Sequence, residues 1–142
     1  MCGIYGITKK NIKWVKSYIK KCHYRGPDKS EIYVDDNVTL GHNLLSITDT
    51  PSQGGQPWKT NRGNILIYNG EIFNYFDLCK KYKNFNPKTK CDTELLAWGL
   101  DEYGIDFIDQ IDSQHAFVLW IPSKKTLYLS RDHAGIKPLF YS

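Results

Sequence analysis

Short β-prone runs joined by short connections constrain the fold of this chain more than any other feature. Residues 31–35 and 38–42 flank the turn pair Asp36-Asn37, and residues 116–121 and 126–130 flank a connection that begins at Pro122. Connections this short join antiparallel neighbours, because a parallel crossover needs a dozen or more residues. Both pairs are therefore predicted to be antiparallel hairpins.

Two segments are predicted to be helices. The first is marked by four residues at intervals of three, four and three, namely Ile12, Val15, Ile19 and Cys22. It follows a short buried strand predicted over 4–8. The second helix is predicted over 93–103, with Asp92 as its N-cap and Gly104 at its end.

Breaker residues divide the middle of the chain. Residues 50–63 contain five glycines and prolines and are predicted to form a loop. A strand is predicted over 64–68, ending at Asn69-Gly70, and a further strand over 139–141. Many antiparallel pairs with two helices predict a layered α+β domain over residues 1–142.

Composition excludes several classes of protein. The chain has 142 residues, of which 41% are hydrophobic and 24% charged, so a disordered tail or a disulfide-dense miniprotein is not expected. The net charge of +4 comes from lysines scattered in pairs, a pattern that solvates a surface and does not indicate a nucleic-acid or membrane partner. Neither a membrane span nor a secretory signal is evident, which predicts a cytoplasmic protein.

Cys2 is the first candidate for a catalytic residue. Removal of Met1 would leave a cysteine that carries a thiol and a free α-amine, a nucleophile and its base in one residue. An α-amine titrates near 7.7–8.0, close to working pH. A cysteine at position two also arises by accident, and a retained Met1 would acylate the nitrogen and remove the base.

Asn69 and Gly70 close an apolar run, which admits two interpretations. A plain turn at the end of a strand accounts for the pair. Alternatively, the Asn69 amide and the Gly70 backbone N–H form an oxyanion hole, in which one donor is worth about 2.7–4 kcal/mol.

Six motifs stand in order along the chain: MCGI at 1–4, RGPD at 25–28, LSITD at 45–49, NGEIFN at 69–74, CDTE at 91–94 and RDHAGIKPL at 131–139. In this order they resemble the glutaminase domain of asparagine synthetases. The chain is thus similar to class II glutamine amidotransferases of the N-terminal nucleophile hydrolase fold. The resemblance implies a four-layer αββα sandwich with antiparallel sheets, shortened at its C-terminal end.

The resemblance also implies a chemistry. Cys2 would attack the side-chain amide of glutamine, Asn69 and Gly70 would stabilise the oxyanion, and Asp92 would hold the α-ammonium group. Six further residues would line the same pocket, namely Leu44, Leu45, Ser46, Ile47, Thr48 and Glu71. No metal, nucleotide or organic cofactor is implied, and His42 and His115 are expected to be structural.

The sequence departs from the family at the carboxylate clamp. Family members carry an arginine before Leu-Ser-Ile that binds the α-carboxylate of glutamine, and Leu44 stands at that position here. Losing one partner of such a buried pair costs roughly 2–5 kcal/mol. Lys59 or Arg62, in the predicted loop, could supply the missing charge.

Two further departures concern the core and the length. His115 stands where the family has a core aromatic residue, which predicts local repacking or a solvent-facing edge. The family domain normally continues past 131–139 and is followed by an ATP-binding synthetase domain. The chain is therefore expected not to make asparagine alone, and a separate ammonia-accepting synthetase subunit is a possible partner.

Two functions follow from these observations. The first is a glutaminase that releases ammonia from glutamine through a thioester on Cys2. The alternative is a degenerate, weakly active or inactive domain of the same fold with a binding or structural role, favoured by Leu44, by His115 and by the shortened end.

Overall fold

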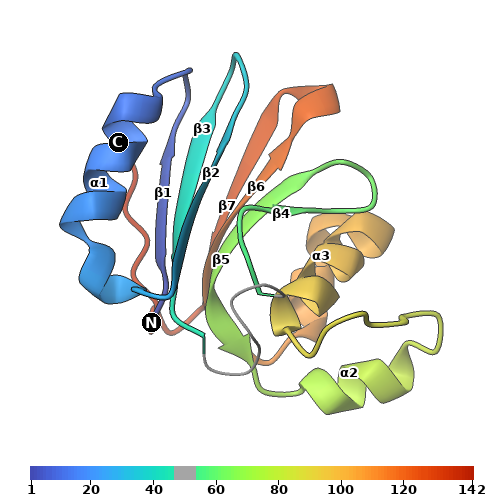
Figure 1. Cartoon of the computed structure of the whole chain (residues 1–142). Coiled ribbons are helices and arrows are strands. Elements are labelled where there is room, and N and C mark those ends of the chain that lie inside the picture. Colours follow the sequence, from blue (N-terminus) through green and yellow to red (C-terminus); the bar gives the residue numbers. More distant parts are fainter. Residues whose placement is uncertain (47–53) are drawn as a thin grey trace.

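Two antiparallel sheets form the centre of the computed structural model, which describes residues 1–46 and 54–142 (Figure 1). The first sheet has the strand order β1-β3-β2, formed by β1 (Gly3–Ile7), β2 (Lys29–Val34) and β3 (Thr39–Leu44). The second sheet has the order β4-β5-β6-β7, formed by β4 (Trp58–Lys59), β5 (Ile65–Ile72), β6 (Ser113–Ile121) and β7 (Thr126–Arg131). The two hairpins predicted from short connections, β2–β3 and β6–β7, are confirmed.

Helices cover the outer faces of both sheets (Figure 1). Helix α1 (Ile12–Lys21) packs on the first sheet, and the side chain of Asn11 caps its start by accepting a hydrogen bond from the N–H of Trp14 at 3.1 Å. Helices α2 (Tyr75–Lys81) and α3 (Asp92–Tyr103) lie beyond the second sheet. Three short 3₁₀ segments complete the described part of the chain: η1 (His23–Arg25), η2 (Gly104–Gln110) and η3 (Pro122–Lys124).

Alternation along β5 explains the layering. Ile65 and Ile67 point into a core between the two sheets, where they meet Leu40 and Val118. The intervening Leu66 and Tyr68 point to the opposite face, into the core beneath α3. A strand buried on both faces requires a layer on each side, so the four-layer αββα sandwich implied by the resemblance is confirmed.

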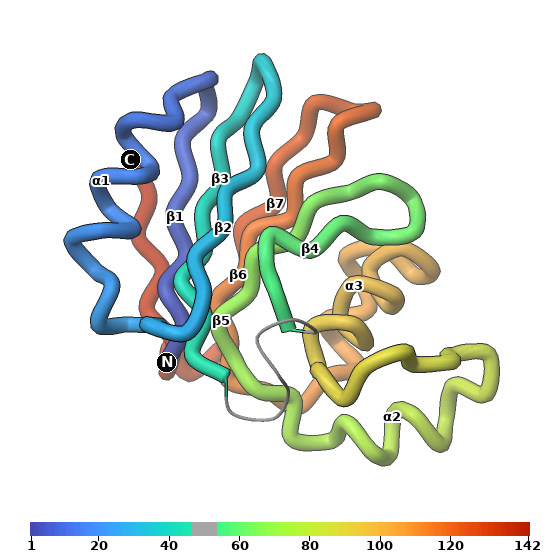
Figure 2. The backbone as a smooth tube through the Cα atoms, viewed as in Figure 1, coloured from blue at the N-terminus to red at the C-terminus, as the bar shows by residue number. Residues whose placement is uncertain are grey.

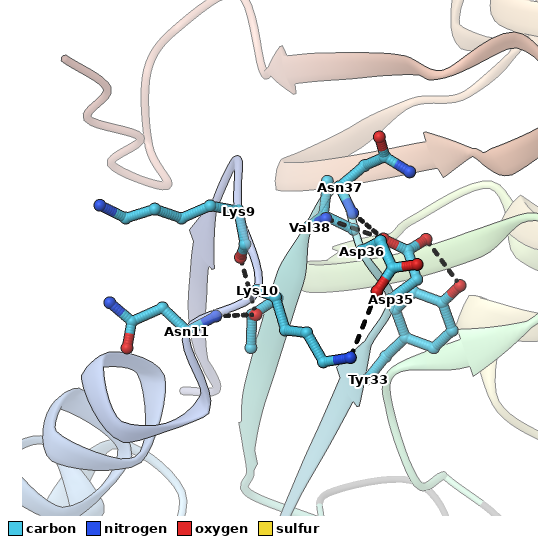
Figure 3. Close-up of polar contacts among 9 residues, drawn as sticks. Lys9, Lys10, Asn11, Tyr33, Asp35, Asp36, Asn37 and Val38 are labelled. Atoms are coloured by element: carbon cyan, nitrogen blue, oxygen red, sulfur yellow. Dashed lines mark hydrogen bonds and ion pairs between the residues drawn. The ribbon is translucent and has the colours of Figure 1, made fainter.

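A network of polar contacts secures the β2–β3 turn. The carboxylate of Asp35 accepts hydrogen bonds from the N–H groups of Asn37 and Val38, at 2.7 and 2.8 Å, and from the hydroxyl of Tyr33 (Figure 3). The indole N–H of Trp120 donates to the same carboxylate at 2.7 Å, and Trp120 lies on β6. This turn therefore links the first sheet to the second.

Some sequence predictions of local structure were wrong. Strand β5 does not end at Asn69-Gly70 but continues to Ile72, because Gly70 pairs with His115 on β6. A Cβ at position 70 would lie 2.4 Å from the carbonyl oxygen of Gln114, so glycine serves a close approach here and not a turn.

The helix ends and the chain end also differ from expectation. Asp92 is the first residue of α3 and not its N-cap, which is Cys91, and the Asp92 carboxylate bonds to β5. The predicted stop is right, because Gly104 adopts φ 69° at the end of α3. No strand forms over 139–141, where Phe140 is exposed. Within the described ranges, no helix has the length and apolarity needed to cross a membrane.

Candidate active site

The two sheets bring Cys2 and Asn69 to the same end of the sandwich. Asn69 follows Ile65 and Ile67 on the face of β5 that points to the first sheet. Cys2 precedes Ile4, which packs into that inter-sheet core, so both side chains belong to facing surfaces. The start of β1 and the ends of β3 and β5 lie at one end of the molecule (Figure 2).

A cavity of about 280 Å³ opens at this end. Its size lies near the lower limit for ligand pockets, roughly 300 Å³, and suits a small molecule. Eight of the residues predicted from the sequence line it, namely Cys2, Leu44, Leu45, Ser46, Asn69, Gly70, Glu71 and Asp92. Ile47 and Thr48 were predicted to line it as well and lie outside the described residues.

The thiol of Cys2 is held against the end of β3. The N–H of Leu45 donates to its sulfur at 3.4 Å, and the sulfur lies 3.8 Å from the carbonyl oxygen of Leu45. Burial raises the pKa of the thiol, while the hydrogen bond from Leu45 acts in the opposite direction. The protonated thiol is therefore favoured, and a base is needed to generate the thiolate.

The RGPD motif supports the nucleophile from behind. The guanidinium of Arg25 donates to the carbonyl oxygen of Cys2 at 3.4 Å. The carboxylate of Asp28 accepts the N–H of Ser46 at 2.7 Å, and the N–H of Asp28 donates to the carbonyl of Leu44. The motif thus fixes the backbone on both sides of the Cys2 sulfur.

Asn69 presents an amide to the cavity. Its side chain is largely buried, and no hydrogen bond joins that amide to another described residue. An amide whose N–H groups are free, in the same cavity as a cysteine sulfur, can donate hydrogen bonds to a developing oxyanion. Gly70 lines the cavity next to it.

Asp92 places a carboxylate in the same cavity. One oxygen, Oδ2, accepts the backbone N–H of Ile72 and the hydroxyl of Tyr68, both at 3.0 Å. Burial raises the pKa of this carboxyl group, and three hydrogen bonds, from Ile72, Tyr68 and the backbone N–H of Thr93, partly offset the rise. The other oxygen, Oδ1, lies 4.0 Å from the Cys91 sulfur, and Asp92 lines the cavity, where its carboxylate can meet a cation.

Sequence reasoning missed several residues that complete the cavity wall. Gln56 spans two elements, since its carbonyl oxygen accepts the N–H of Tyr68 at 2.6 Å and its amide nitrogen donates to Thr93 at 3.3 Å. Gln114 and Lys137 also line the cavity. The Gly-Gly-Gln-Pro run at 54–57 gave a signal for a loop but none for a buried amide.

The two suggested replacements for the family arginine do not reach the cavity. Arg62 lies 3.6 Å from Glu102 in an exposed ion pair, and Lys59 is exposed on β4. Leu44 is buried with 7% of its surface exposed and lines the cavity. Among described residues, Lys137 is the one cationic side chain in the lining.

Both histidines singled out in the sequence have structural surroundings. His42 is fully buried and its Nε2 lies 3.2 Å from the carbonyl oxygen of Tyr68, and burial lowers its pKa to about 4. His115 is buried between the hydroxyls of Ser113 and Ser130 and stacks on Phe117. Local repacking is thus the right interpretation of His115, and a solvent-facing edge is wrong.

Comparison with known proteins gives one family. The model of the family described as "Glutamine amidotransferase domain" matches residues 1–142. The chain is 34% identical over 151 aligned residues to "Asparagine synthetase [glutamine-hydrolyzing] 2" of Bacillus subtilis, an alignment that covers all of this chain and 20% of the relative.

Two further relatives are also asparagine synthetases by name, at the same identity. Asparagine synthetase B of Escherichia coli is 34% identical over 150 residues, which cover 99% of this chain and 26% of that protein. A probable asparagine synthetase of Acanthamoeba polyphaga mimivirus is 34% identical over 151 residues, covering 99% of this chain and 27% of the relative. The chain therefore spans about a fifth to a quarter of the length of these relatives.

Proposed function

This chain belongs to the class II glutamine amidotransferase domain family, and we propose that it hydrolyses the side-chain amide of glutamine, with Cys2 as the nucleophile. The observation that carries the proposal is the single cavity lined by Cys2, Asn69, Gly70 and Asp92. These residues come from three separate segments of the chain.

The first half of the reaction forms a thioester. After loss of Met1, the α-amine of Cys2 takes the thiol proton, directly or through a water molecule, and the sulfur bonds to the amide carbon. The carbonyl oxygen becomes an oxyanion that accepts hydrogen bonds from the Asn69 amide and the Gly70 N–H. The proton passes to the amide nitrogen, the carbon–nitrogen bond breaks, and ammonia leaves.

The second half regenerates the enzyme. Water gives a proton to the α-amine and attacks the thioester carbon, the same donors stabilise the second oxyanion, and the carbon–sulfur bond breaks. Glutamate is released and the thiol regains its proton. The sum is glutamine and water converted to glutamate and ammonia, without a cofactor.

The remaining lining residues orient the substrate. The carboxylate of Asp92 would bind the α-ammonium group, and Leu44, Leu45, Ser46 and Glu71 would surround the rest of the glutamine. Ile47 and Thr48 are proposed to contribute through their backbone, as the resemblance implies.

The relatives suggest where the ammonia goes. Their names describe asparagine synthetases that hydrolyse glutamine, and they are much longer than this chain. We propose that the ammonia passes to a synthetase domain or to a separate synthetase subunit, within asparagine biosynthesis. Location in the cytoplasm is part of this proposal and rests on the sequence, in which neither a membrane span nor a secretory signal is evident.

Leu44 favours a second candidate function, a domain of the same fold with little catalytic activity. An apolar side chain at the position of the family arginine weakens recognition of the α-carboxylate, and neither Lys59 nor Arg62 lines the cavity. A domain with the same fold and little turnover would then have a binding or structural role.

Ammonia release separates the two functions. Protein shown by mass to have lost Met1 is incubated with glutamine over a range that extends to millimolar concentrations, alongside Cys2→Ala. Saturable ammonia release that is absent from Cys2→Ala supports the glutaminase. Equal blanks in both proteins at every concentration support the degenerate domain.

A further inference from the structure

Lys137 is a buried cation in the cavity to which the proposed reaction assigns no role. Only 7% of its surface is exposed, and it lines the cavity together with Cys2. Burying an ammonium group is costly unless the protein gains something from its position. The residue belongs to the RDHAGIKPL motif and lies far from Cys2 in sequence.

The backbone around Lys137 is fixed by one carboxylate. Asp132 accepts the N–H of Lys137 at 2.9 Å, that of Ile136 at 2.8 Å and that of His115 at 3.1 Å. Although burial alone would raise the pKa of Asp132, these three hydrogen bonds outweigh it and lower the pKa to about 2. The Lys137 side chain is therefore anchored at its base by a carboxylate that stays ionised.

The ammonium group itself contacts Met1. Nζ lies 3.1 Å from the Sδ of Met1, and within the described ranges no carboxylate lies within ion-pair distance of it. A thioether is a weak acceptor and a poor partner for a charge. Met1 is bonded to the nitrogen of Cys2, so its removal takes away this contact. It also creates a new α-amine on Cys2, the residue next to the one that Nζ contacts.

We propose that Lys137 is a positioning residue for the processed terminus: its ammonium group lies beside the α-amine of Cys2 and keeps that amine in the neutral form that accepts the thiol proton. The proposal rests on the proposed function and deepens it. A nearby like charge disfavours the protonated amine, and a cation within a few ångströms lowers an amine's pKa by about one unit or more.

Other charged groups act on the same amine. The guanidinium of Arg25, bonded to the Cys2 carbonyl, adds to the effect of Lys137. The carboxylates of Asp92 and Glu71 in the cavity wall, and that of Asp28 near Ser46, oppose it. The titratable thiol of Cys91 and the hydroxyl of Tyr68 also line the cavity. The contribution of Lys137 to the pKa of the α-amine is therefore measured as a difference between variants.

The test follows the α-amine directly. Met1-free protein in a Cys2→Ser background, which removes the competing thiol, is acylated with acetic anhydride at a series of pH values, and N-terminal acylation is read by mass. The variants are Lys137→Met, Lys137→Arg and, as a control for net charge, Lys124→Met on the exposed β6–β7 connection.

We expect the amine of the Lys137→Met protein to titrate about one pH unit higher than that of the parent. Lys137→Arg and Lys124→Met should titrate like the parent. The acid limb of kcat/KM in the Cys2 protein should shift by the same amount in Lys137→Met. Equal midpoints for folded Lys137→Met and the parent overturn the proposal.

The parent protein alone provides a test that does not depend on whether the variants fold. Its amine must titrate below the ordinary range of about 7.7–8.0. A midpoint inside or above that range overturns the proposal without any variant. Because acylation needs no turnover, a Lys137-dependent midpoint in a protein without glutaminase activity refutes the proposed function and leaves this inference standing.

Discussion

The carboxylate of Asp92, at the first turn of α3, accepts the backbone N–H of Ile72, at the end of β5, over 3.0 Å. This bond joins the helix to the strand that carries Asn69 and Gly70. It commits the Oδ2 oxygen to the fold, while Asp92 also lines the cavity. Asp92 therefore has a structural role and a proposed role in binding the substrate.

Replacing this carboxylate should weaken glutamine binding more than catalysis. In Asp92→Asn the amide oxygen can still accept the Ile72 N–H, but the charge that would hold the α-ammonium is lost. Charged hydrogen bonds are worth about 1.5–3 kcal/mol, so KM should rise about tenfold to a hundredfold. Glu94→Gln, in the same helix turn and outside the cavity lining, is the matched control. An unchanged KM in folded Asp92→Asn contradicts the assignment.

The amide of Asn69 should matter for turnover and not for stability. Asn69→Ala removes an oxyanion donor, for which we expect kcat to fall about 10²- to 10³-fold at a similar KM. Thermal unfolding should change little, because the amide bonds to no other described residue. A kcat within threefold of the parent would exclude this donor from the mechanism.

Restoring a guanidinium should strengthen substrate binding. Leu44 faces the cavity in place of a cation, so Leu44→Arg should lower the KM for glutamine about thirtyfold or more. Leu44→Gln, polar and uncharged, controls for the loss of the leucine. If KM stays the same or rises in folded Leu44→Arg, the α-carboxylate does not bind near position 44.

Burial of His42 should make stability depend on pH. Its folded pKa of about 4 lies below the ordinary 6.5, so the unfolded chain binds the extra proton first as pH falls. Stability is fully present above the unfolded value and decreases as pH falls from 6.5 towards 4. From about pH 7.5 to about pH 5 this group should cost about 2 kcal/mol.

Urea unfolding of the parent and His42→Asn at the two pH values checks this expectation. The decrease should be smaller by that amount in His42→Asn, whereas His133→Gln, exposed near the chain end, should retain the full decrease. Identical decreases in all three proteins would show that His42 is not the titrating group.

The elements that the sequence predicts best are those defined locally. Short connections determine the two hairpins, and the three-four-three spacing from Ile12 predicts α1 to within one residue of its end. Helix α2 was missed, since its seven residues bury only Leu78. A pattern that short has no periodicity to detect.

Contacts between distant segments could not be predicted from the residues alone. Gly70 gave a turn signal because nothing in the sequence shows that Gln114 lies against it. Asp92 gave a capping signal because its bond to Ile72 depends on how α3 packs on β5. The order of six motifs suggested which residues share the site, but Gln56 and Lys137 became visible only in the folded chain.

A second nucleophile can trap the acyl group on Cys2 and so reveal the thioester itself. Met1-free protein is incubated with glutamine and hydroxylamine, a nucleophile that competes with water for a thioester. We expect γ-glutamyl hydroxamate to form at the expense of glutamate, with ammonia released in both cases, and Cys2→Ala to form neither product. Glutamate and ammonia without hydroxamate at saturating hydroxylamine, or undiminished turnover by Cys2→Ala, would contradict capture of the amide carbon by the Cys2 sulfur.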